Sequence, residues 1–111
     1  MPKTWIIDET PDLLLVTRRK PVRWDIEARA EFPKAHALRL AHQIRQDMWR
    51  ELKKIKGFCP AVEIEKGETL KVRAGGRVAR HVHPMANGWV EDLLNSDIHR
   101  RRWLAYSKLK T

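Results

Sequence analysis

The residue types best suited to chemistry in this chain are the two histidines of the sequence His81-Val82-His83. Residues two apart on a β-strand point to the same side, so on a strand both imidazoles could bind one metal ion. A stable site needs a third ligand, and the available side chains are His99, Cys59 and Glu91. The spacing selects none of them, and no CxxC or HExxH motif is present. A metal-dependent hydrolase or nuclease that uses His81 and His83 is therefore one alternative function, ranked second after the protein-interaction alternative given below. Strand histidines that are half-buried or exposed and bind no metal are, however, commoner than metal ligands.

Cys59 and the pair Gly75-Gly76 could also take part in chemistry or ligand binding, but both have simpler structural explanations. Cys59 is the only cysteine, so no disulfide forms within the chain, and we expect a small buried hydrophobe at this position. Gly75-Gly76 before Arg77 lacks the strand, GxxxxGK and helix context of a phosphate-binding loop, so a bulge or turn is expected. Because no catalytic triad or cofactor motif is recognisable either, the sequence favours a non-enzymatic protein without a cofactor.

The charge of the chain gives the strongest indication of a partner. The sequence has 23 Lys and Arg against 14 Asp and Glu, a formal net charge of +9. Residues 18–56 alone hold twelve basic and five acidic residues, a net charge of +7. Such a charge favours polyanions, which means DNA, RNA or an acidic protein surface.

Within residues 18–56, basic and amide side chains recur every three or four residues, as on one face of a helix. The members of this stripe are Arg39, Gln43, Gln46, Arg50 and Lys53. Guanidinium and amide groups present directed donors that bind phosphates and base edges. The simpler explanation is a solvated helix face, because Arg, Lys and Gln are good helix formers. We predict nucleic-acid binding through the stripe, with help from a loop cluster that comprises Arg18, Arg19 and Arg23.

The main alternative is a protein-interaction or assembly subunit that binds an acidic partner. Trp49 lies one position off the apolar side of the predicted helix, close to Arg45 and Lys53. An exposed ring there would stack on a base or anchor a protein, whereas packing at the edge of the core is the simpler explanation. A third basic cluster, 100–102, would spread over about 200° of a helix. At least one of these arginines should therefore lie near the core or pair with an acid.

The sequence also restricts the compartment. No apolar run approaches the roughly 20 residues that span a bilayer, so we expect no membrane partner. The N-terminus lacks the apolar segment of a secretory signal. Together with the single cysteine, these features favour the cytoplasm.

The elements that must position these residues indicate one α+β domain over 1–111. The clearest element is a helix from about Pro33 to Lys56. Its apolar side recurs at helical spacing and comprises Ala37, Leu40, Ala41, Ile44, Met48, Leu52 and Ile55. Gly57 stands where a residue of left-handed conformation commonly ends a helix.

The strands are predicted from β-prone runs and from alternation. Residues 5–7 and 13–16 flank a turn-rich stretch and predict an N-terminal hairpin. Residues 24–29 alternate as a half-buried strand would, and a short helix over 24–31 is the competing interpretation. Residues 61–83 predict an antiparallel meander with Ile64 opposite Leu70, Val62 opposite Val72, a loop at 66–68 and a third strand over 78–83.

The last third of the chain is expected to be helical. Asn87 could cap a helix that contains Trp89 and Leu94, and Ser96 is a good N-cap for a second helix. One continuous bent helix is the competing interpretation.

Overall fold

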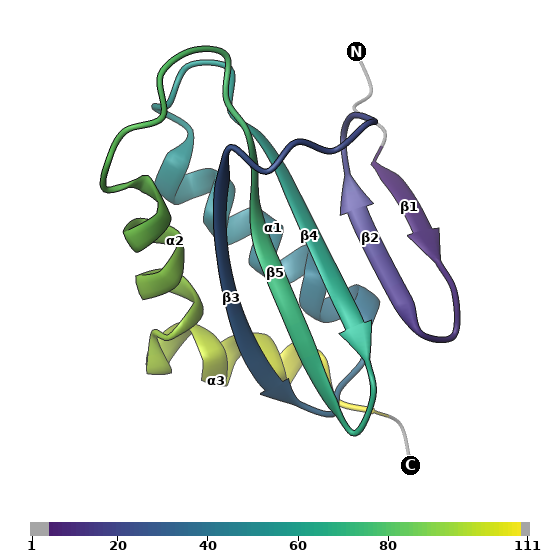
Figure 1. Ribbon diagram of the computed structural model, residues 1–111. Coiled ribbons are helices and arrows are strands. Elements are labelled where there is room, and N and C mark those ends of the chain that lie inside the picture. The colour runs from purple at the N-terminus through teal and green to yellow at the C-terminus, as the bar shows by residue number, and fades with distance from the viewer. Residues whose placement is uncertain (1–4, 110–111) are drawn as a thin grey trace.

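Five antiparallel strands and three helices make up residues 5–109, the part of the chain that the computed structural model describes (Figure 1). In chain order they are β1 (Ile6–Glu9), β2 (Leu13–Thr17), β3 (Ile26–Pro33), α1 (Ala37–Leu52), β4 (Cys59–Lys66), β5 (Thr69–Arg77), α2 (Ala86–Leu94) and α3 (Asp97–Tyr106). The strands form one sheet in the order β1-β2-β4-β5-β3. The predicted α+β class, N-terminal hairpin, long helix and C-terminal helices are confirmed. None of the described helices is both long and apolar enough to cross a membrane.

The core lies between α1 and one face of the sheet, and α2 and α3 pack beside α1 toward β3 (Figure 1). Leu40, Ile44 and Met48 of α1 are fully buried, as the apolar stripe predicted. They face a sheet surface that includes Val16 of β2 and Val62 of β4, which lie opposite each other. Because strand residues alternate, the opposite face of the sheet carries the charged side chains of β3, β4 and β5.

The long helix is shorter than predicted at both ends. Pro33 is the last residue of the edge strand β3, where its missing N–H costs no ladder hydrogen bond. His36 is the N-cap instead, and its Nδ1 accepts a hydrogen bond from the Arg39 N–H at 3.3 Å. After Leu52 the chain continues in turns until Gly57, whose φ of +73° is left-handed as expected.

The alternation over 24–29 belongs to strand β3, so the competing short helix is wrong. Ile26, Ala28 and Phe32 are buried on the core side of this strand. The predicted third strand over 78–83 is also wrong, because β3 rather than 78–83 pairs with the outer side of β5. The chain leaves the sheet at Val78, whose N–H donates to the Asp25 carboxylate at 3.0 Å.

The β4–β5 hairpin forms, but its register differs from the prediction by two residues. Ile64 lies opposite Val72 and Val62 opposite Ala74, so the pairing of Ile64 with Leu70 is wrong. A shift of two residues leaves every side chain on its predicted face, because strand residues alternate with a period of two. The apolar residues therefore still face the core.

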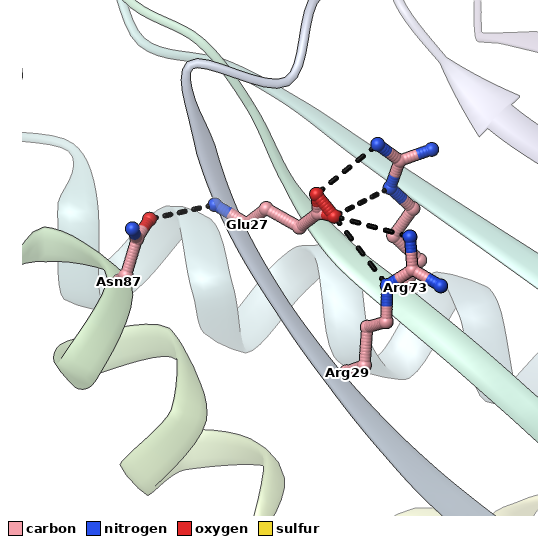
Figure 2. A network of polar contacts seen from close by, with 4 residues as sticks. All are labelled: Glu27, Arg29, Arg73 and Asn87. Atoms are coloured by element: carbon pink, nitrogen blue, oxygen red, sulfur yellow. Dashed lines mark hydrogen bonds and ion pairs between the residues drawn. The ribbon is translucent and has the colours of Figure 1, made fainter.

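The C-terminal region forms two separate helices, and the continuous bent helix is wrong. Ser96 caps α3 as predicted, with its side chain accepting from the His99 N–H at 3.5 Å. Asn87 does not cap α2, because Met85 occupies the N-cap position. The Asn87 side-chain oxygen instead accepts a hydrogen bond from the backbone N–H of Glu27 in β3 at 2.8 Å, as Figure 2 shows.

A buried carboxylate joins α3 to α1. Asp47 is 6% exposed and accepts a hydrogen bond from Nε1 of the fully buried Trp103 at 2.7 Å. The Arg102 guanidinium pairs with the same carboxylate. Arg100 stacks on Phe32 and donates to two backbone carbonyls. The expectation that at least one arginine of 100–102 lies near the core or pairs with an acid is thereby confirmed.

Gly75 and Gly76 let three backbones approach closely near the end of β5, where this strand lies between β3 and β4. Their φ values are +154° and +144°. A Cβ atom at Gly75 would lie 1.9 Å from the carbonyl oxygen of Ile26, and one at Gly76 would lie 2.0 Å from that of Cys59. The glycine pair is thus required by strand packing within β5, and the predicted bulge or turn is replaced by continuous strand.

Gly75→Ala should lower the free energy of unfolding by about 3 kcal/mol, because it combines backbone strain with a clash against the backbone of β3. Gly88→Ala is the matched control, since no atom lies within 4 Å of a Cβ there and the residue is in helix α2. That change should raise stability by about 0.5–1 kcal/mol. Urea denaturation of both variants tests the prediction, and effects of the same sign would contradict it.

Asp47→Ala should lower the free energy of unfolding by about 2–3 kcal/mol, because it leaves the buried Trp103 N–H without an acceptor. Arg102→Gln should cost less than about 1 kcal/mol, since the Arg102 side chain is 43% exposed. Denaturation curves for the two variants measure the difference. Equal losses would show that the Asp47–Trp103 hydrogen bond does not anchor α3.

Candidate nucleic-acid interface

The outer face of α1 carries the stripe that the sequence predicted. Arg39, Gln46, Arg50 and Lys53 are exposed, and Gln43 is half-buried. Arg50 lies 3.5 Å from the Asp47 carboxylate, which partly neutralises it. Arg39 and Lys53 make no ion pair within the described residues. The stripe therefore offers two cations without a competing carboxylate.

The predicted loop cluster divides between the two faces of the sheet. Arg18 continues the core side of β2 and reaches Trp5, next to α1. Arg19 and Arg23 instead border a shallow depression with Cys59 and Arg77, on the face that α1 does not cover. Arg23 also pairs with Asp25 at 2.9 Å. The structure thus brings Arg18 toward the stripe and keeps Arg19 and Arg23 away from it.

Trp5 gathers two arginines from separate elements. The Arg18 Cζ lies 4.6 Å and the Arg45 Cζ 4.2 Å from the centroid of the Trp5 ring. Neither guanidinium pairs with a carboxylate of the described residues, and the buried Nε of Arg18 has no hydrogen-bond partner among them. Sequence reasoning missed this cluster because it joins the start of the N-terminal hairpin to the middle of α1. The only local signal was a tryptophan beside a strand.

Burial and like charge both act on this cluster. Burial, and then the positive charge of Arg18, lower the pKa of the Arg45 guanidinium. Arg45 Nε donates to His42 Nδ1 at 3.1 Å. Burial, and then the charge of Arg45, lower the pKa of His42, so this imidazole is held as a neutral acceptor. The two guanidinium groups of the cluster thus lack a carboxylate partner, while the Trp5 ring and His42 hold them in place.

Trp49 lies on the same flank of α1 as His42 and Arg45. Its side chain is 41% exposed, and its ring stacks on Phe58 with 6.3 Å between centroids and an interplanar angle of 9°. The ring thus packs at the edge of the core and remains accessible to solvent. An accessible indole beside cations is a stacking platform for an unpaired base.

The face of the sheet that α1 does not cover balances its own charges. Figure 2 shows Arg73 and Arg29 converging on the Glu27 carboxylate. Arg73 donates to both carboxylate oxygens, at 3.0 and 3.1 Å, and its guanidinium lies over Trp24. These hydrogen bonds lower the pKa of Glu27 and keep it ionised. Arg23, Arg29 and Arg73 on this face therefore already have carboxylate partners.

The histidines proposed for a metal site lie on the connection between β5 and α2. The segment that holds His81 and His83 is not a strand, so the alternation argument does not apply. His81, His83 and His99 line one cleft of about 740 Å³. Within residues 5–109, no group of three His, Cys, Asp or Glu side chains is arranged to hold a metal ion. Glu91 is exposed on α2, and Cys59 begins β4.

The lowered pKa of His42 should make stability depend on pH. As the pH falls below about 6.5, the unfolded chain takes up a proton at this residue before the folded chain does, so folding loses stability. His42→Gln keeps an acceptor for Arg45 and removes this titration. Denaturation midpoints at pH 7.5 and 5.5 should fall more for the unaltered chain than for the variant. The same pH dependence in both would contradict the assignment.

Comparison of the chain with protein-family models, with curated proteins and with solved structures gives no match. The geometry and charge of the chain itself are therefore the guide to its function. They single out the side of the molecule formed by α1 and Trp5.

Proposed function

We propose that this protein binds nucleic acid through a basic-aromatic surface on α1 and the adjoining hairpin. We define this surface by the residues Trp5, Arg18, Arg39, Arg45, Gln46, Trp49 and Lys53. It keeps Arg39, Gln46 and Lys53 of the stripe predicted from the sequence and adds Trp49 and the Trp5 cluster. Gln43 is left out because it is half-buried, and Arg50 because the Asp47 carboxylate partly neutralises it. Arg19 and Arg23 are left out because they lie on the other face of the sheet.

The observation that carries the proposal is the pair of guanidinium groups on Trp5. Two like charges held close together repel each other, and the Trp5 ring compensates only part of that cost. A phosphate would supply the missing opposite charge and accept directed hydrogen bonds from both arginines. By contrast, Arg73 and Arg29 already share Glu27 and would gain less from a phosphate.

The exposed ring of Trp49 favours single-stranded over double-stranded nucleic acid. Unpaired bases can stack on an accessible aromatic side chain, whereas the bases of a duplex are already stacked. Phosphate contacts by the arginines and Lys53 would hold the backbone of the strand. Affinity would then come mainly from charge, with stacking adding about 1–3 kcal/mol per base.

Labelled single-stranded DNA and RNA 20-mers should bind in a fluorescence anisotropy titration, and the affinity should fall steeply between 50 and 200 mM salt. Arg39→Gln with Lys53→Gln should weaken binding roughly tenfold or more and reduce the slope of log affinity against log salt by about one unit per lost contact. Arg45→Gln should also weaken binding, because it removes half of the unpaired guanidinium cluster.

The control is Arg29→Gln with Lys71→Gln, which also removes two positive charges, but from the uncovered face of the sheet. Arg29 pairs with Glu27, and Lys71 lies opposite Glu65 and Glu31 on its neighbouring strands. This variant should bind nearly as well as the unaltered chain. If both double variants lose the same affinity, binding depends on net charge alone and not on the basic-aromatic surface. If neither 20-mer binds at 50 mM salt, the proposal is overturned. A salt-sensitive complex with an acidic protein in that second case would favour the alternative partner.

A further inference from the structure

A cleft lies where the end of α1 meets the segment 78–85, α2 and the start of α3. Its volume of about 740 Å³ falls in the range of small-molecule sites, which is about 300–1,000 Å³. The turn after α1 and the segment 78–85 are joined at this place, since the Ala79 N–H donates to the Lys56 carbonyl at 3.2 Å. The cleft is therefore built by four separate parts of the chain.

One wall of the cleft is a stacked pair of aromatic rings. His83 and Trp89 have ring centroids 4.7 Å apart and an interplanar angle of 28°. His83 Nδ1 accepts a hydrogen bond from the Met85 N–H at 3.0 Å, which fixes the orientation of the imidazole. Trp89 nevertheless remains 40% exposed. A fixed aromatic wall open to solvent suits a planar ligand ring, because stacking would remove its apolar surface from water.

The His83 hydrogen bond also indicates which role this imidazole takes. With Nδ1 accepting, the neutral ring carries its proton on Nε2 and presents a donor rather than a metal-binding lone pair. His99 Nδ1 lies 2.7 Å from the Ser96 Oγ, a contact in which either atom can be the donor. His83 is therefore the histidine that suits recognition of an acceptor atom on a ligand.

The polar rim of the cleft combines both signs of charge. Lys54 and Lys56 are exposed and form no ion pair within the described residues, so they are free to bind an anionic group. Glu51 and Asp92 border the same cleft and can accept hydrogen bonds from amino or hydroxyl groups. A ligand that matches this rim carries a phosphate together with N–H or O–H donors.

We propose that this cleft binds a nucleotide unit, with its base stacked on the exposed surface of Trp89 and its phosphate held by Lys54 and Lys56. The unit is either a free nucleotide or one nucleotide of a bound strand, because both present the same ring and phosphate. The cleft is separate from the basic-aromatic surface, and its occupation does not depend on the function proposed above.

Isothermal titration calorimetry with AMP, adenosine, ribose 5-phosphate and an adenosine pentanucleotide tests this proposal. AMP should bind more tightly than adenosine, and ribose 5-phosphate should bind weakest because it cannot stack. Trp89→Ala should weaken AMP binding about 5- to 150-fold, in line with the loss of one stacked base. Lys54→Gln should weaken AMP binding and leave adenosine binding unchanged. Trp89→Phe should restore most of the affinity, since it restores an aromatic ring.

Arg29→Gln is the control, because Arg29 lies on the uncovered face of the sheet, outside both proposed binding sites, and this variant should leave AMP affinity unchanged. If AMP does not bind but the pentanucleotide does so in a Trp89-dependent manner, the occupant is a nucleotide of a strand. Because Trp89 and Lys54 are exposed, their variants should remain folded, and a thermal melt of each variant checks this. If neither AMP nor the pentanucleotide shows any dependence on Trp89, the nucleotide assignment is overturned.

Discussion

The hydrogen bond between the Asp47 carboxylate and the buried Trp103 indole fixes how α1 is rotated about its own axis. Asp47 and Arg45 are two residues apart and therefore lie about 200° apart around the helix. With Asp47 turned toward α3, Arg45 is turned toward the hairpin, where it meets Trp5. The same rotation sends the apolar residues into the core and Arg39 and Lys53 into solvent. The position of α3, the composition of the core and the placement of the cations all follow from this one orientation.

The two sides of the molecule handle charge in different ways. On the uncovered face of the sheet, cross-strand neighbours of opposite sign neutralise one another, as Glu27 and Arg73 do. On the side of α1, the only buried carboxylate of the helix is already used by Trp103 and Arg102. Of the cations on that side, Arg18 and Arg45 lie over the Trp5 ring without a carboxylate partner. Carboxylates thus compensate cations more fully on the uncovered face of the sheet than around Trp5.

Local patterns in the sequence predicted the elements but not their long-range pairing. The buried positions of α1, such as Leu40 and Ile44, follow from helical spacing, and the capping role of Ser96 follows from its side chain. The partner of β5 did not follow, because pairing with β3 links segments about 40 residues apart and nothing local specifies it. The predicted hairpin register was wrong by two residues for a related reason, since either register puts the apolar residues on one face.

The candidate surface was predictable only in its helical part. The stripe with Arg39 and Lys53 could be read from spacing alone, because a single helix positions it. The meeting of Trp5, Arg18 and Arg45 depends on tertiary packing between two elements, which no periodicity reveals. The nucleotide cleft is a similar case, since its histidines gather only after the expected strand over 78–83 is replaced by an irregular connection.

The contact between Asn87 and Glu27 has a consequence for self-association. It occupies one outward-facing N–H of the edge strand β3, and Arg100 occupies the outward carbonyl of Glu31 in the same strand. A foreign strand that aligned with β3 would have to displace both side chains before it could extend the sheet. Sheet extension by another chain is therefore directed to β1, a strand of only four residues that ends in Asp8 and Glu9. Short length and acidic side chains make that edge a poor template for the growth of aggregates.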